Sequence, residues 1–228
     1  MIDLTKVKVP KDEVLRYLGY KKQVLSSDLD SLIDETIEDI KSLIMPKFVY
    51  AEYKTIIHED SVELEGTNLV LEGNDIREHL KNASSTVIMA VTLGTMIEKK
   101  ISFYEKINLT KALILDSCAT TIVEEICDLI EEEVKEDATE KGLGITFRYS
   151  PGYGDLPLKT QRDFINTLRA DKSIGLTASE HYLLFPRKSV TAIIGLIPKN
   201  LETKKRTCEV CKNYNNCSFR KEGATCGS

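Results

Sequence analysis

The spacing of apolar residues predicts several helices along the chain. Apolar side chains recur three and four positions apart in residues 10–19 and 28–45, as amphipathic helices require. The same period is sustained longest in residues 109–137 and predicts one long helix there. A further helix is expected near residues 159–171. These helices are separated by segments with a different period.

The remaining patterns are those of β-strands. Residues 54–71 alternate between apolar and polar positions around a GTN turn, which predicts a hairpin. Residues 86–94 are continuously apolar and β-branched, as in a strand buried on both faces, and residues 189–197 are a second such candidate. Helices and strands mix without a strict βαβ rhythm. The expected fold is therefore α+β, with a mixed, largely antiparallel twisted sheet flanked by helices.

The long helix is expected to have two faces. The residues predicted to face the core share the helical spacing: Leu115, Cys118, Ile122, Ile126 and Leu129. Another stripe carries polar side chains: Ser117, Thr121, Glu124 and Asp128. Spacing favours solvent over a ligand pocket for this stripe, and the acidic run 124–137 is interpreted as solvated except where Glu124 turns inward. Cys118 and Cys127 lie on opposite sides of the helix and are expected to fill the core.

The composition of the chain limits the classes of function that it can have. The chain has 228 residues, 42% of them hydrophobic and 29% charged, which suits a globular domain with a small appendage. A formal net charge of -5 argues against nucleic acid or an anionic membrane as partner. No apolar run approaches the roughly 20 residues of a membrane span. We therefore expect a soluble cytoplasmic protein. The three histidines are expected to be surface or structural residues.

The last part of the chain differs from the rest. Residues 199–228 hold seven Lys and Arg against three Asp and Glu, which divides the chain into a domain over 1–198 and a cysteine-rich tail over 199–228. Four cysteines lie in this tail: Cys208, Cys211, Cys217 and Cys226. Four thiolates at this spacing favour a zinc ion or an iron-sulfur cluster, with two disulfides or a reduced tail as alternatives.

The two metals predict different roles for the tail. Zinc would be structural, because it would fold a segment that lacks an apolar core. A cluster would instead relay electrons. The basic residues of the tail could attract an acidic electron carrier such as flavodoxin or ferredoxin, although solvation of a small module is the more ordinary explanation.

The glycine-rich stretch FRYSPGYGDLP carries the clearest candidate chemistry. Gly152 and Gly154 allow sharp turns and close approach of a ligand. Arg148 offers a planar fork of donors to a carboxylate, and Tyr149 and Tyr153 add aromatic faces. These groups suit a zwitterionic or cationic small molecule, while an ordinary loop remains the alternative. Asp155 and Lys159 could touch a ligand, or could be a turn cap and a helix start.

The strings RYSPGYGDLPLKTQ and IGLTASEHYLLFPRKSVTAIIG resemble the activation domain of cobalamin-dependent methionine synthase, in its separately encoded bacterial form. That family carries an Arg-x-x-Pro-Gly-Tyr motif followed by a Leu-Thr...Pro...Ser-Val block. The matching residues here are Arg148, Pro151, Gly152 and Tyr153, then Leu176, Thr177, Pro186, Ser189 and Val190. The resemblance covers roughly residues 10–197.

The resemblance implies a site for S-adenosylmethionine. Arg148 would bind the methionyl carboxylate, while the backbone of Ser150, Pro151 and Gly152 and the side chain of Tyr153 would line the cofactor. Glu124 would hold the amino group, with Glu125 nearly as good a candidate.

The implied activity is reductive methylation of cob(II)alamin held on a separate methionine synthase, with no acid-base residue required of this chain. Two alternatives stay open. One is a metal-tailed electron-transfer activator or docking protein for other corrinoid methyltransferases, and the other is a regulatory sensor of S-adenosylmethionine.

Overall fold

The computed structural model describes residues 7–21 and 23–201, and an antiparallel sheet forms the centre of this part. Its strands lie in the order β3-β2-β1-β4-β8-β5. Their bounds are β1 (Lys47–Ile57), β2 (Ser61–Leu64), β3 (Val70–Glu72), β4 (Ser85–Thr92), β5 (Leu143–Ile145) and β8 (Ser189–Pro198). Every pairing in the sheet is antiparallel, which confirms the α+β prediction. A separate two-stranded ribbon pairs β6 (Thr177–Ala178) with β7 (Leu184–Phe185).

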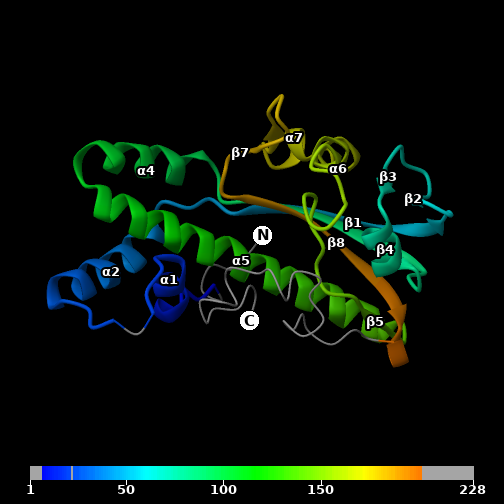
Figure 1. Cartoon of the computed structure of the whole chain (residues 1–228), viewed down its shortest axis with the longest axis horizontal. Coiled ribbons are helices and arrows are strands. Elements are labelled where there is room, and N and C mark those ends of the chain that lie inside the picture. Colours follow the sequence, from blue (N-terminus) through cyan, green and yellow to red (C-terminus); the bar gives the residue numbers. More distant parts are fainter. Residues whose placement is uncertain (1–6, 22, 202–228) are drawn as a thin grey trace.

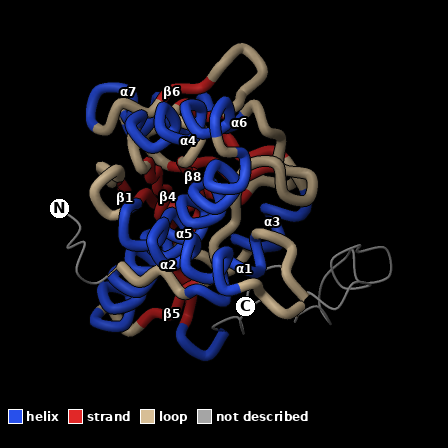
Figure 2. The backbone as a smooth tube through the Cα atoms, turned by 90° about the vertical axis from the view of Figure 1, so that its left-hand side faces the viewer, coloured by secondary structure: helices blue, strands red, loops and turns tan. Residues whose placement is uncertain are grey.

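Helices cover both faces of the sheet (Figure 1). One face packs against the long α5 (Leu109–Glu140), and α1 (Lys11–Tyr17), α2 (Ser27–Ile40) and α4 (Thr95–Ile107) pack against α5 and share its apolar core. The other face packs against α3 (Asn74–Leu80), α6 (Thr160–Leu168) and the short α7 (Ala170–Ser173). Seen from the end, α6 and α7 lie above the strands and α1 and α2 lie below α5 (Figure 2). The chain continues beyond β8 as a single 3-10 turn, Lys199–Leu201.

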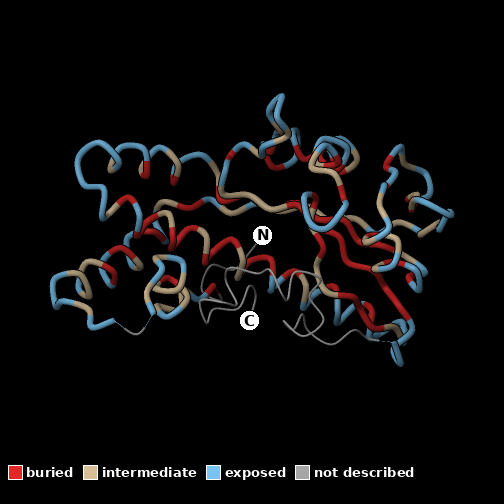
Figure 3. Tube along the Cα trace, in the orientation of Figure 1, coloured by how far each residue is buried: buried red, intermediate tan, exposed pale blue. Residues whose placement is uncertain are grey.

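The central strands are buried on both faces because the sheet separates two apolar cores. Along β4, Val87, Met89 and Val91 point toward α5, while Ile88 and Ala90 point toward α6. Burial therefore runs continuously along this strand and recurs at intervals along α5 (Figure 3). The uninterrupted apolar pattern of residues 86–94 predicted this strand correctly.

Several predicted boundaries are confirmed and others are wrong. The long helix begins at Leu109, where the side chain of Asn108 accepts a hydrogen bond of 3.0 Å from the Lys111 amide and caps the helix. The helix expected over 28–45 ends at Ile40. The helix expected over 159–171 is interrupted at Arg169, whose φ of 49° is left-handed. Helices α3 and α4 were not predicted.

The predicted faces of α5 need a correction. Cys118 and Cys127 are fully buried as expected, but Leu129 is 36% exposed. Ser117 and Thr121, which were assigned to solvent, are buried. The reason is that α5 packs against the sheet on one side and against α1, α2 and α4 on another, so the apolar stripe does not mark the whole covered surface. The Thr121 hydroxyl is satisfied by the Ser117 carbonyl at 3.1 Å.

Candidate functional site

The segment that carries Arg148 runs beside strand β8. The Tyr149 amide donates to the Ile193 carbonyl at 2.9 Å, and the Ile193 amide donates back to the Tyr149 carbonyl at 2.8 Å. Because side chains alternate across an extended backbone, neighbouring residues point to opposite faces of the sheet. Tyr149 enters the core beneath α6, and Arg148 points toward α5.

Arg148 lies among three carboxylates of α5. Its side chain is only 17% exposed. The Nη2 atom is 3.3 Å from Glu124 Oε2, and the Nη1 atom is 2.6 Å from Asp128 Oδ1 and 3.0 Å from Glu131 Oε2. The three acids share one face of the helix because their spacings are four and three residues. We call Arg148, Glu124, Asp128 and Glu131 the Arg148 cluster.

The Arg148 cluster holds more negative than positive charge. Three carboxylates face one guanidinium, so two negative charges are uncompensated within the cluster when all four groups are ionised. Burial raises the pKa of Glu124, an effect that Arg148 opposes and Asp128 reinforces. Asp128 and Glu131 both lie at ion-pairing distance from Nη1, so more than one carboxylate acts on the buried guanidinium.

The structure separates the two candidate acids. Glu124 meets Arg148 directly, whereas the charges that act on Glu125 are those of Asp128, Lys8 and Glu13. Of the two, Glu124 is thus the one placed to act together with Arg148.

Residues 150–153 form a tight turn after Arg148. The Tyr153 amide donates to the Ser150 carbonyl at 3.1 Å, and the Gly152 amide donates to the Leu156 carbonyl at 2.9 Å. Gly152 has a φ of 91°, which explains the glycine. Pro151 is buried, whereas the Tyr153 side chain is 51% exposed. The turn therefore presents backbone and one aromatic ring at the surface.

The rest of this loop serves the fold. Asp155 caps the start of α3, since its carboxylate accepts hydrogen bonds of 2.7 Å from the Asn74 amide and 3.0 Å from the Asp75 amide. Lys159 pairs with Glu72 at 2.9 Å. For both residues the structure supports the structural alternative of a cap and a helix start.

The Ser-Val block also has a structural explanation. Ser189 opens β8, and its hydroxyl lies 2.6 Å from the Pro186 carbonyl and 2.8 Å from the Thr92 hydroxyl. Val190 packs against the core beneath α5. These contacts order the start of the strand on which the Arg148 segment rests.

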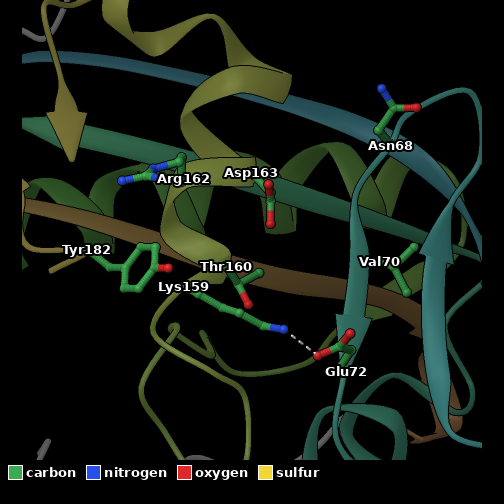
Figure 4. Close-up of a pocket in the computed structure, with 8 residues that line it drawn as sticks. All are labelled: Asn68, Val70, Glu72, Lys159, Thr160, Arg162, Asp163 and Tyr182. Carbon is green, nitrogen blue, oxygen red and sulfur yellow. Dashed lines mark ion pairs between the residues drawn. The ribbon is translucent and has the colours of Figure 1, made fainter. Parts of the chain in front are cut away.

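Two surface hollows lie on the opposite face of the sheet, between α6 and the hairpin β2–β3. They measure about 330 and 530 Å³ and share Asn68 and Asp163 as lining residues. Figure 4 shows Lys159 and Asp163 of the α6 side facing Val70 and Glu72 of β3 across the smaller one. Their charged groups are balanced, in contrast to the Arg148 cluster. No sequence motif indicated these hollows.

Asp128 and Glu131 are the residues that sequence reasoning missed, because the acidic run was interpreted as solvated apart from Glu124. The signal was present, since positions 124, 128 and 131 share a helix face. Helical spacing alone does not show which segment of the chain covers that face.

The cysteine prediction lies outside the described residues. Cys208, Cys211, Cys217 and Cys226 fall in the segment 202–228, so the metal, the acidic electron carrier and the boundary at residue 198 all stay predictions. Cys118 and Cys127 are free and buried, and burial raises the pKa of the Cys118 thiol to about 12. Within residues 7–21 and 23–201, no group of His, Cys, Asp and Glu side chains is arranged to hold a metal ion.

The three histidines lie in structural or surface positions. His79 packs against Phe147 and Tyr149 with ring centroids 4.4 and 5.1 Å away, which confirms a structural role. His58 and His181 are exposed, as expected. None of the helices in the described ranges combines the length and hydrophobicity that crossing a membrane requires.

Comparison with known proteins adds a likeness of fold. No protein-family model and no curated protein matches the chain. Among solved structures, the chain is similar to the MetH reactivation domain, which was crystallised bound to AdoHcy. The two superpose with a TM-score of 0.68 over 97% of this chain and 83% of that chain, at 13% sequence identity. The chain therefore has the fold of the MetH reactivation domain.

Proposed function

We propose that the chain binds S-adenosylmethionine at the Arg148 cluster and supports reductive methylation of cob(II)alamin carried by a separate methionine synthase. The observation that carries this proposal is the pairing of Arg148 with Glu124. The amino-acid end of the ligand bears a carboxylate and an ammonium group, and recognising both takes a cation and an anion side by side. The fold likeness to a domain crystallised with AdoHcy supports the same ligand class.

The proposed roles follow from the chemistry of each group. Arg148 would take the ligand carboxylate, and Glu124 would take the ammonium group. The turn at Ser150, Pro151 and Gly152 would offer backbone to the nucleoside, and the half-exposed ring of Tyr153 would cover it.

The methyl transfer itself requires no acid-base side chain from this chain. Once one electron has reduced cob(II)alamin, the resulting cobalt(I) is a strong nucleophile that takes the methyl group from the sulfonium and leaves a neutral thioether. The protein would contribute alignment and exclusion of water, so no general base is needed. This agrees with a site built from charge-pairing groups.

Calorimetry tests the binding step. We expect wild type to bind one equivalent of S-adenosylmethionine and Arg148→Ala to bind it at least about 30-fold more weakly, from the loss of about 2 kcal/mol in charged hydrogen bonds. Arg162→Ala is the matched control, because Arg162 is exposed on the opposite face and donates to the Ser179 carbonyl at 3.2 Å. Absence of binding by wild type, or equal binding by Arg148→Ala, contradicts the proposal.

A second assay separates binding from transfer. Radiolabelled methyl from S-adenosylmethionine should reach cobalamin on a methionine synthase that lacks its own reactivation domain, given a chemical reductant and this protein. Tight binding without transfer would instead favour a regulatory sensor.

A further inference from the structure

We propose that exposed apolar side chains at the turn between α4 and α5 form the surface onto which the cobalamin-carrying partner docks. This inference rests on the proposed function and deepens it, because it gives that partner a place on this chain. We call Phe103, Ile107, Leu109 and Leu113 the hairpin patch. Their exposed fractions are 52%, 64%, 62% and 54%.

The first argument is the concentration of exposed apolar side chains on the helical hairpin α4–α5 (Figure 1). The four side chains of the hairpin patch lie within residues 103–113. A single exposed hydrophobic residue is ordinary, whereas several on one short stretch mark a surface that another molecule covers. The turn is also fixed in place, because Asn108 caps α5. A partner would therefore meet a preformed surface.

The second argument is position. Residues 113, 120 and 124 are seven and four positions apart and share one face of α5. Leu113 lies about 16 Å along the axis from Glu124, where the ligand ammonium group would bind. Between them, Lys188 Nζ is 2.9 Å from Asp116 Oδ1 and 2.8 Å from Thr120 Oγ1. The hairpin patch and the Arg148 cluster therefore lie toward two ends of one helix face.

The third argument is the size of a protein interface. Methyl transfer brings cobalt to the ligand at the Arg148 cluster, so the partner must cover that end of the face. A specific interface buries about 800 Å² on each protein, which corresponds to a disc about 32 Å across. A disc of this size centred near Thr120 covers Glu124 and Leu113 together. The partner that reaches the ligand therefore also reaches the hairpin patch.

The charges around the patch indicate the chemistry of the partner surface. Lys99 and Lys106 are four and three positions from Phe103 and share its face of α4. Lys100 Nζ lies 5.6 Å from the centroid of the Phe103 ring. The acids of α4 are Glu98, which accepts a hydrogen bond of 3.3 Å from the Lys188 amide, and Glu105 seven residues later on the same side as Glu98. A partner surface with an acidic rim around an apolar centre fits this face.

Acids on neighbouring helices have cations of their own. Asp39 of α2 lies 3.2 Å from Lys111, and Asp116 of α5 lies 2.9 Å from Lys188. Two copies of this chain that met through the patch would bring its lysines together. The tail over 199–228 also holds more Lys and Arg than Asp and Glu. Charge therefore disfavours both of these occupants and favours the separate partner.

The test measures methyl transfer against partner concentration. The partner is a methionine synthase that lacks its own reactivation domain and is loaded with cob(II)alamin, and a chemical reductant and radiolabelled S-adenosylmethionine are supplied. Four proteins are compared: wild type, the double variant Leu109→Gln with Leu113→Gln, Lys106→Glu, and Leu201→Gln. The last is the control, because Leu201 is also an exposed leucine, at 43%, and lies beside β5 beyond the other end of α5. Calorimetry measures S-adenosylmethionine binding, and thermal melting checks folding.

We expect the double variant to raise the partner concentration for half-maximal transfer at least about tenfold, with S-adenosylmethionine affinity within about twofold of wild type. Lys106→Glu should raise that concentration about threefold at low salt and less at about 0.5 M salt, and Leu201→Gln should leave it unchanged.

The outcomes separate this inference from the proposed function. An unchanged half-maximal concentration in the double variant overturns the inference alone, as does a wild-type dimer in light scattering that the double variant abolishes. A Lys106→Glu variant equal to wild type overturns the acidic rim. If wild type binds no S-adenosylmethionine, the proposed function fails and the inference fails with it.

Discussion

The segment from Phe147 to Asp155 contacts the rest of the protein in two ways. Toward α6 and α3 it is fixed by shape: Tyr149 is buried, its hydroxyl donates to the Tyr153 carbonyl at 3.1 Å, and Asp155 caps α3. Toward α5 it makes contact through the charged Arg148, whose acidic partners include the 64%-exposed Asp128. The first contact depends on close packing and the second on charges that can exchange partners.

This difference would allow one short loop to be rigid and still bind the proposed ligand. A ligand that replaces Asp128 at Arg148 leaves the hydrogen bonds on the other side of the segment intact. Preorganisation of this kind reduces the cost of binding, because the backbone is already in place. Substitutions on the α6 side should therefore change stability, and substitutions on the α5 side should change binding and pH dependence.

The largest expected effect is on the packed side. Gly154 has a φ of 53°, and a Cβ there would collide with the Tyr149 hydroxyl and lie 3.1 Å from the Asp75 Cβ. We expect Gly154→Ala to lower the free energy of unfolding by about 2–3 kcal/mol. Gly142→Ala is the control, since Gly142 has a φ of 73° with nothing within 4 Å and should cost about 1 kcal/mol. Urea titration measures both, and equal losses would refute close packing at Gly154.

A smaller effect with a clear pH dependence is expected on the charged side. Arg148→Ala removes the cation that opposes the effect of burial on Glu124, so the pKa of Glu124 rises further in the folded state. A carboxyl group whose folded pKa is raised above the unfolded value stabilises the protein below that range and loses this contribution as pH rises. The variant should therefore match wild type near pH 4 and be about 1 kcal/mol less stable at pH 7.

Melting temperatures across this pH range provide the measurement. A deficit that is constant from pH 4 to pH 7 would indicate that Arg148 contributes packing rather than charge. Arg162→Ala should show no pH-dependent deficit, because the Arg162 side chain contacts the neutral Ser179 carbonyl and the ring of Tyr182.

The sequence allowed the fold class to be predicted, and it singled out two residues that the structure brings together, Arg148 and Glu124. Strand β4 and helix α5 have long, unbroken patterns, and the motif around Arg148 together with the acid at 124 led to two residues that lie 3.3 Å apart. Helix α4 was missed because its two buried residues, Ile97 and Ile101, form too short a pattern to stand out.

The parts that could not be predicted depend on which surfaces meet. Ser117 and Thr121 are buried because α5 is packed on more than one side, a property of the assembled helices rather than of the α5 sequence. Asp128 and Glu131 face Arg148 because residue 148 follows β5 and runs beside β8. Helical spacing shows that such residues share one helix face, but the pairing of distant strands determines which side chains they contact.

The smallest expected effect concerns the surface hollows between α6 and the hairpin β2–β3, on the other face of the sheet from the Arg148 cluster. Lys159 and Glu72 form an ion pair of 2.9 Å whose side chains are 55% and 60% exposed. Exposed pairs contribute little because water and salt screen them, so Lys159→Ala should change the free energy of unfolding by less than about 0.5 kcal/mol. Affinity for S-adenosylmethionine should also stay within about twofold of wild type, since Lys159 faces β3 and not α5. A clear loss of affinity would contradict binding at the Arg148 cluster and would place the ligand in the hollows between α6 and the hairpin β2–β3.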